Sequence, residues 1–139
     1  PSRLVGSEMC IRDRNNNVRN KKICFLGVTF KANTDDMRDS SCLAMIPSLV
    51  KKGAKINYFD PTGKKNDFNK IKNVTFSNDI KSAIAKADLI IIHTEWNDFK
   101  SINFKKDVKN KNYKIFDMRN IYSSKKMKEL NIKYFAIGC

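Results

Sequence analysis

Short, continuously apolar runs separated by helical segments are the feature that most restricts how this sequence can fold. The run Leu89–Ile92 in DLIIIHT contains no polar residue, so both faces of a strand formed there must be buried. Strands buried on both faces occur almost only in parallel sheets, where a long crossover, usually a helix, joins each strand to the next. The sequence therefore predicts an α/β fold with an open, mostly parallel sheet, helices on both faces and a single domain.

The expected elements alternate from residue 21 to the end of the chain, as in a Rossmann-like sheet. Strands are expected at 21–27, 54–60, 74–77, 88–94, 112–118 and 132–138, and helices at 40–53, 79–87 and 123–131. In the first helix we expect Ser40 or a preceding Asp to be the N-cap and Gly53 to end the helix. That helix also carries Pro47, at some cost in stability.

The net charge of +14 raises the question of a nucleic-acid partner, since clustered Lys and Arg can neutralise phosphates. The positive residues are mostly Lys, and they are scattered through every segment among many Asn and Ile, which is a bias typical of AT-rich codons. We therefore expect no nucleic-acid partner. We also expect no membrane partner, because no apolar run approaches the ~18–20 residues of a membrane span.

The first residues do not fit the alternating pattern. The stretch RLVGSEMCIRDR, at 3–14, has no helical or strand period and resembles the in-frame translation of a sequencing adapter. We expect residues 1–14 to be a disordered, non-native leader, 15–20 to be a linker and 21–139 to be the domain. On this interpretation the protein's own N-terminal portion is missing.

The four cysteines are far apart and form no C-x-x-C pair, so the sequence predicts neither a zinc site nor a thioredoxin-like redox site. Cys24 and Cys42 lie in apolar stretches and are expected to be small buried hydrophobic residues, while Cys10 and Cys139 lie near the two ends. We assign no metal ligand.

Three loops with unusual polar residues follow expected strands. They are TFKANTDDMRDS at 29–40, TEWNDF at 94–99 and DMRNIY at 117–122. Ligands of open parallel sheets bind beyond the carboxyl ends of the strands, so these loops are expected to form one site. The first loop has no G-x-G-x-x-G fingerprint, but Lys31 and Arg38 suit a diphosphate, Lys as a point charge and Arg as a planar fork.

Together with the terminal KYFAIG, these motifs resemble the C-terminal, UDP-sugar-binding domain of the UDP-glucose 6-dehydrogenases, within the UDP-glucose/GDP-mannose dehydrogenase family. The likeness implies a cytoplasmic oxidoreductase that converts UDP-glucose to UDP-glucuronate with NAD, through a catalytic cysteine. In that family an N-terminal domain binds NAD and a central helical region makes the homodimer contact. No segment here matches the Gly-rich loop or the cysteine motif, so the chain alone is expected to be inactive and to hold no catalytic residue.

The resemblance also implies roles for individual residues. Phe30 and Lys31 would contact the substrate, and Arg119 in DMRN would contact the nucleotide sugar. Arg38 would reach the diphosphate of NAD bound by the other domain. Met118 stands where the family more often has Gly, which bears on the local backbone because Gly tolerates positive φ and Met does not.

Other polar residues at the strand ends have structural interpretations. We expect His93 to pack at the end of its strand and not to act as a general base, and Trp96 to pack against the edge of the sheet. Glu95 and Asp60 are expected to be caps and not an acid–base pair. Lys31 and Arg38 could also be solvated residues that form weak surface pairs with nearby Asp side chains.

Three alternative functions remain open at this stage. One is a dehydrogenase for another nucleotide sugar, such as UDP-N-acetylmannosamine or GDP-mannose. Another is a non-enzymatic nucleotide-binding module that is complete in this one domain. The third is a basic nucleic-acid-binding domain, which predicts salt-sensitive binding of DNA or RNA that UDP does not displace.

Overall fold

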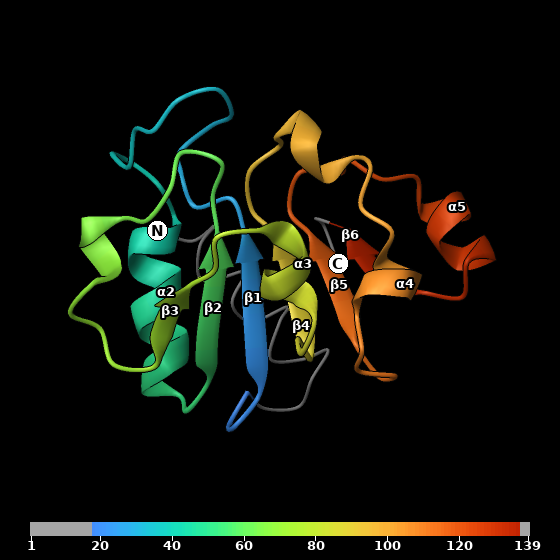
Figure 1. Ribbon diagram of the computed structural model, residues 1–139, viewed down its shortest axis with the longest axis horizontal. Coiled ribbons are helices and arrows are strands. Elements are labelled where there is room, and N and C mark those ends of the chain that lie inside the picture. The colour runs from blue at the N-terminus through green and yellow to red at the C-terminus, as the bar shows by residue number, and fades with distance from the viewer. Residues whose placement is uncertain (1–17, 137–139) are drawn as a thin grey trace.

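The computed structural model describes residues 18–136, and its centre is a six-stranded sheet in which every strand pair is parallel (Figure 1). The strands are β1 Lys22–Leu26, β2 Lys55–Phe59, β3 Val74–Phe76, β4 Leu89–Ile92, β5 Lys114–Asp117 and β6 Lys133–Ala136. Their order across the sheet is β3-β2-β1-β4-β5-β6, so the order reverses between β1 and β4. The predicted Rossmann-like α/β sheet is confirmed, and all of its described strands are parallel.

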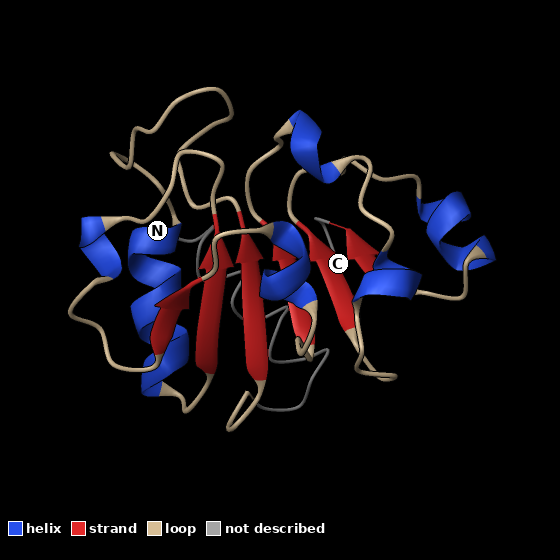
Figure 2. Ribbon diagram, viewed as in Figure 1, coloured by secondary structure: helices blue, strands red, loops and turns tan. Residues whose placement is uncertain are grey.

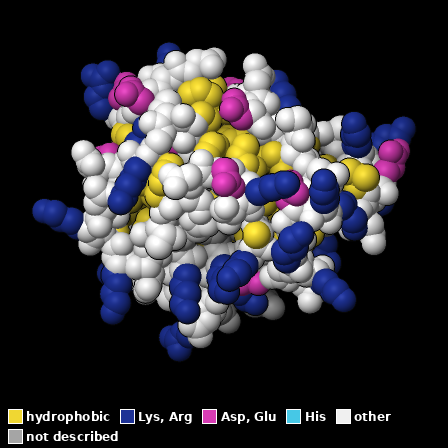
Figure 3. Space-filling model, in the orientation of Figure 1, with side chains coloured by type: hydrophobic (Ala, Val, Ile, Leu, Met, Phe, Trp, Pro, Cys, Tyr) yellow, Lys and Arg dark blue, Asp and Glu magenta, His cyan; other side chains and the backbone are white. Residues whose placement is uncertain are grey.

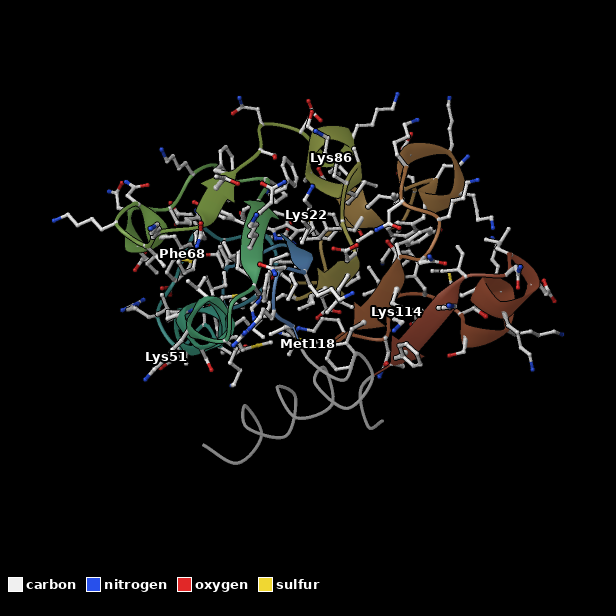
Figure 4. All side chains as sticks on the ribbon, turned by 90° about the horizontal axis from the view of Figure 1, so that it is seen from below. Lys22, Lys51, Phe68, Lys86, Lys114 and Met118 are labelled. Carbon is white, nitrogen blue, oxygen red and sulfur yellow. The ribbon has the colours of Figure 1, made fainter. Side chains whose placement is uncertain are left out.

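Helices cover both faces of this sheet (Figures 2 and 4). The helix α2, Cys42–Lys51, lies on one face, whereas α3 Ile80–Ile84, α4 Phe104–Asp107 and α5 Ser124–Glu129 pack on the other. Alternation along β1 separates the two cores, because Phe25 packs in the cluster with α2 and Cys24 packs in the cluster with α3. No helix in the described part of the chain has the length and apolar character needed to cross a membrane.

The start of α2 differs from the sequence prediction by one residue. The N-cap is Ser41 and not Ser40, and the Ser41 side chain makes no capping hydrogen bond. The Ser40 hydroxyl instead donates to the Val28 carbonyl oxygen and accepts from the Cys42 N–H at 3.2 Å. Ser40 therefore supports the first turn from outside the helix. The helix α4 and the 3-10 turns η1 Asn66–Phe68 and η2 Asn97–Phe99 are too short for a hydrophobic period to reveal them.

The N-terminal boundary of the described core lies at Val18. This residue belongs to the expected linker, yet it is 2% exposed and packs in the cluster that includes α2. The Asn20 N–H also donates to the Gly53 carbonyl oxygen at 2.9 Å, which ties this stretch to the end of α2. The expected leader at 1–14 lies outside the described residues.

Two buried carboxylates shape the loops at the carboxyl ends of the strands. Asp60, after β2, accepts the N–H of Val28 at 2.8 Å and the N–H of Thr62 at 2.9 Å. Asp117, at the end of β5, accepts hydrogen bonds from the Tyr134 hydroxyl and from the backbone N–H groups of Arg119, Ile121 and Tyr122. A buried carboxylate is tolerated when donors surround it in this way, so both aspartates hold loop backbone in place.

Gly27 allows the chain leaving β1 to touch the chain leaving β4. Its φ is +80°, and a Cβ built on it would lie 2.6 Å from the Cβ of Thr94. Both the backbone conformation and the space therefore exclude a larger residue. The contact places the loop after β1 directly against the first residues after β4.

We predict that Gly27→Ala destabilises the chain far more than Gly63→Ala. Gly63 also has a positive φ, of +95°, but nothing lies within 4 Å of its missing Cβ. The Gly27 change adds a clash to the conformational cost, so it should lower the free energy of unfolding by roughly 2–5 kcal/mol, against about 1–2 kcal/mol for Gly63→Ala. Urea unfolding of both variants measures this, and equal losses would show that the Thr94 contact does not constrain the fold.

Candidate functional site

The loops after β1, β4 and β5 meet at the carboxyl edge of the sheet, at the top of Figure 1. Their strands are neighbours in the sheet, and the strand order reverses between β1 and β4 beside them. Crevices at such reversal points are the usual ligand sites of open α/β sheets. The sequence prediction that these loops converge is therefore confirmed by the topology and by the hydrogen bonds described next.

Arg119 connects all three loops. From the loop after β5, its Nε donates to the His93 carbonyl oxygen at 2.9 Å, and its Nη2 donates to the Phe30 carbonyl oxygen at 3.1 Å. The guanidinium has further N–H groups, and no carboxylate among residues 18–136 forms an ion pair with it. Arg119 is thus held in a defined position with part of its donor capacity and its full charge available to a ligand.

Met118 does not distort the backbone that presents Arg119. It is not among the described residues with positive φ, and its N–H donates to the Ile92 carbonyl oxygen at 3.0 Å, which continues the pairing of β5 with β4. Its side chain packs against the cluster that contains α2. The left-handed residue in this loop is instead Asn120, with φ of 56°, and Asn tolerates that conformation well. The loop therefore forms without a glycine at position 118.

Phe30 and Lys31 present their side chains to solvent from a fixed backbone. The Phe30 side chain is 45% exposed, and Lys31 is exposed with no hydrogen bond or ion pair to its ammonium within residues 18–136. Their backbone is held because the Thr29 hydroxyl donates to the Lys31 carbonyl oxygen at 2.9 Å and the Phe30 N–H donates to the Asp36 carbonyl oxygen at 3.0 Å. An exposed aromatic ring and an exposed ammonium thus project from the backbone segment that Arg119 contacts through the Phe30 carbonyl oxygen.

Arg38 lies in the same loop but takes a different position. Its side chain is 88% exposed and pairs with Asp36, with Nη2 3.0 Å from Oδ2. The hydrogen bonds from Arg38 lower the pKa of Asp36, and the same pairing raises the pKa of Arg38. The structure therefore joins Arg119 to the backbone of Phe30, next to Lys31 in the chain, whereas Arg38 stands in a solvated surface pair with Asp36.

Three other strand-end residues have structural environments, as the sequence predicts. His93 is 3% exposed, and burial, together with the charge of Arg119, lowers its pKa to about 3, so its ring is neutral near pH 7. Trp96 is 8% exposed and packs in a core cluster with Phe99, although its Nε1 has no hydrogen-bond partner among the described residues. Asp60 accepts the backbone N–H groups described above, as predicted, whereas the predicted cap role of Glu95 is wrong, because Glu95 is exposed and makes no capping hydrogen bond within residues 18–136.

The described residues offer no nucleophile or metal site at this edge. Cys24 and Cys42 are buried, and burial raises the pKa of each thiol, so neither can attack a substrate as a thiolate. Cys10 and Cys139 lie outside the described residues. Within 18–136 there is also no group of three or more His, Cys, Asp or Glu side chains that could hold a metal ion. The arrangement is that of a binding surface.

Sequence reasoning missed the residues that hold this surface together. Asp117 follows an aromatic strand residue as Asp60 does, in IFD and YFD, so the same cap pattern was available for it. Thr94 and Ser41 carry no such signal, because their roles depend on contacts with residues far away in the sequence.

Figure 3 shows Lys and Arg around the whole outline of one face, with no single concentrated patch on it.

Comparisons with known proteins show the family of this chain. The model of the UDP-glucose/GDP-mannose dehydrogenase family, UDP binding domain, matches residues 24–124. The UDP-glucose 6-dehydrogenase of Rhizobium meliloti (strain 1021) is 34% identical over 152 residues, which cover 99% of this chain and 35% of that protein. The chain thus spans about a third of the length of this relative.

Solved structures show the same fold. A UDP-glucose dehydrogenase from Pyrobaculum islandicum superposes with a TM-score of 0.75 at 20% identity, covering 96% of this chain and 29% of that chain. An NDP-N-acetyl-D-galactosaminuronic acid dehydrogenase from Methanosarcina mazei Go1 gives 0.78 at 22% identity, covering 99% and 29%. With the family match over most of its length, this chain belongs to the UDP-glucose/GDP-mannose dehydrogenase family and contains its UDP-binding domain.

Proposed function

We propose that this chain is the nucleotide-sugar-binding part of a UDP-glucose 6-dehydrogenase and that its carboxyl edge holds the UDP of UDP-glucose. The observation that carries this proposal is the anchored guanidinium of Arg119, which the carbonyls of Phe30 and His93 hold and which forms no ion pair with a carboxylate of residues 18–136. Positive charge that the described residues leave unpaired, on a rigid edge, suits an anionic ligand.

The three residues would divide the nucleotide between them. The Lys31 ammonium would meet the negative charge of the diphosphate as a mobile point charge, and the remaining N–H groups of Arg119 would form directed bonds with oxygen atoms of the nucleotide sugar. The exposed ring of Phe30 would supply an apolar wall. This division uses the two exposed side chains and the one anchored side chain of the edge.

NAD would be held mainly by parts of the full-length protein outside this chain, and it would accept hydride from C6 of the sugar. The loop after β1 is not built to cradle the NAD diphosphate with its first backbone N–H groups, because those of Gly27 and Val28 already donate to the Phe59 carbonyl oxygen and the Asp60 carboxylate. Arg38 fits a lesser role, since its exposed guanidinium can reach a neighbouring domain while Asp36 orients it. We assign it to the NAD diphosphate.

The full-length enzyme would then oxidise UDP-glucose to UDP-glucuronate in the cytoplasm, as a homodimer. Among residues 18–136 both cysteines are buried, so neither offers an accessible nucleophilic thiol, and the loop after β1 has no G-x-G-x-x-G fingerprint for the NAD diphosphate. We therefore expect the 139-residue chain to bind nucleotide without turning it over.

Full-length protein with its upstream sequence restored should reduce NAD when given UDP-glucose, and more efficiently than with UDP-N-acetylmannosamine or GDP-mannose. The 139-residue chain alone should reduce none. The absorbance of the reduced nicotinamide measures the turnover of the full-length protein and of the chain alone. Turnover by the chain alone would overturn the assignment of nucleophile and cofactor pocket to other domains, and a preference for another sugar would overturn the choice of UDP-glucose.

Calorimetric titration of the 139-residue chain with UDP tests the site directly. Lys31→Ala should weaken UDP binding about 10-fold to 100-fold, because a charge-assisted hydrogen bond contributes roughly 1.5–3 kcal/mol. The control is Lys125→Ala, which removes an equally exposed lysine from α5. If both variants bind UDP as the unsubstituted chain does, Lys31 is only a solvated residue. Salt-sensitive binding of duplex DNA that UDP does not displace would instead favour a nucleic-acid site.

The two loop arginines should separate by ligand in the restored enzyme. Arg38→Ala should mainly raise the KM for NAD, whereas Arg119→Ala should mainly raise the KM for UDP-glucose. Lys at either position should restore little, because an ammonium cannot bond two oxygen atoms as a planar fork does. Steady-state kinetics with each ligand varied in turn gives the KM for NAD and the KM for UDP-glucose of every variant. Equal effects of both variants on both ligands would contradict this division.

A further inference from the structure

A chain of hydrogen bonds runs through the buried ring of His93. Its Nε2 lies 2.8 Å from the Ser41 hydroxyl, and its Nδ1 lies 3.0 Å from the Thr94 hydroxyl. The Thr94 hydroxyl in turn donates to the Thr29 carbonyl oxygen at 3.0 Å. His93, Thr94 and Thr29 are almost completely buried, where water cannot supply hydrogen bonds. The polar atoms of these residues in this hydrogen-bond chain are paired with other protein atoms instead.

The direction of every bond in this chain follows from counting protons. The Thr29 carbonyl oxygen can only accept, so the single proton of the Thr94 hydroxyl must point toward it. Thr94 must then accept from His93, which places the ring proton on Nδ1. A neutral imidazole has no second N–H, so Nε2 accepts and the Ser41 hydroxyl donates.

The chain joins three elements that the candidate site depends on. Ser41 is the N-cap of α2, His93 and Thr94 follow β4, and Thr29 directly precedes the exposed pair Phe30 and Lys31. The backbone carbonyl of His93 is also one of the two acceptors that hold Arg119. One buried ring therefore lies between the start of a helix and both groups of proposed ligand contacts.

We propose that His93 is a positioning residue for the nucleotide site, whose ring fixes the backbone of residues 29–31 against α2. This inference rests on the proposed function, because it concerns the geometry of the same UDP-binding edge. His93 touches no ligand in this role. It acts by holding the Thr29 carbonyl, through Thr94, and by keeping its own carbonyl where Arg119 can reach it.

A catalytic reading of the Ser41 and His93 pair does not fit the contacts. A serine nucleophile needs a histidine that takes its proton and is then stabilised by a carboxylate on the other nitrogen. Here the other nitrogen faces the hydroxyl of Thr94. Burial and the charge of Arg119 also disfavour the imidazolium that such a step would form.

The test compares UDP binding by calorimetry for variants of the 139-residue chain. His93→Leu keeps roughly the bulk of the ring but removes both nitrogens. Ser41→Ala removes the hydroxyl at one end of the hydrogen-bond chain. Each should weaken UDP binding about 5-fold to 10-fold, the effect of losing one hydrogen bond of roughly 1–1.5 kcal/mol. Ser41→Thr keeps the hydroxyl and should restore the affinity.

A matched control comes from the same helix. Ser48 lies in α2 and is bonded to Lys52 at 3.1 Å, so Ser48→Ala removes a serine hydroxyl from α2 without touching the chain through His93. It should leave UDP binding unchanged. Urea unfolding of each variant confirms that it is folded under the conditions of the titration. If His93→Leu does not fold, the comparison of Ser41→Ala with Ser41→Thr supplies the answer.

The possible outcomes separate the two proposals. If the unsubstituted chain does not bind UDP, the proposed function fails and the positioning role fails with it. If that chain binds UDP and both Ser41→Ala and His93→Leu bind it equally well, the positioning role alone is wrong. Nitrogen-15 NMR of the ring adds a readout that needs no ligand: the proton is expected on Nδ1 at pH 7, and a proton on Nε2 would overturn the assigned direction of the chain.

Discussion

The close approach of Gly27 to Thr94 is the constraint on which the carboxyl edge depends. Because the side chain of Thr94 fills the space that a Cβ at position 27 would need, the loops after β1 and β4 are pressed together at their first residues. This contact brings the Thr94 hydroxyl within reach of the Thr29 carbonyl oxygen. It also sets the carbonyls of Phe30 and His93 close enough for one guanidinium to bond both.

The charges at this edge are divided between structural and available groups. The carboxylates of Asp60 and Asp117 accept hydrogen bonds from backbone N–H groups. They therefore shape the loops and form no ion pair with a described cation. Asp36 pairs with Arg38 at the surface. Lys31 and Arg119 are left with positive charge that no described carboxylate pairs with. The loop at 29–40 itself carries two cations and three aspartates, so the positive charge offered to a ligand is local to the Lys31 and Arg119 side chains and is not a net charge of the loop.

The sheet could be predicted from sequence because its strands are buried on both faces. The apolar run of β4 requires a covered parallel strand wherever it occurs, and the loops after such strands must emerge at one edge. Lys31 was accessible to the same reasoning through its charge in such a loop, and Phe30 and Arg119 were accessible through the family resemblance. The contacts that hold them were not, since the bonds from Ser41 to His93 and from Arg119 to Phe30 join residues 52 and 89 positions apart.

Arg119 is anchored by main-chain oxygen atoms, and this has a consequence for how the edge can vary between related proteins. Every residue type carries a carbonyl, so exchanging the side chain at position 30 leaves both acceptors in place, whereas at position 93 the ring is also needed to hold the backbone. An insertion or deletion in either loop would instead displace an acceptor. The edge should therefore tolerate drift in side-chain identity while demanding fixed loop lengths, which permits ligand preference to change without rebuilding the anchor.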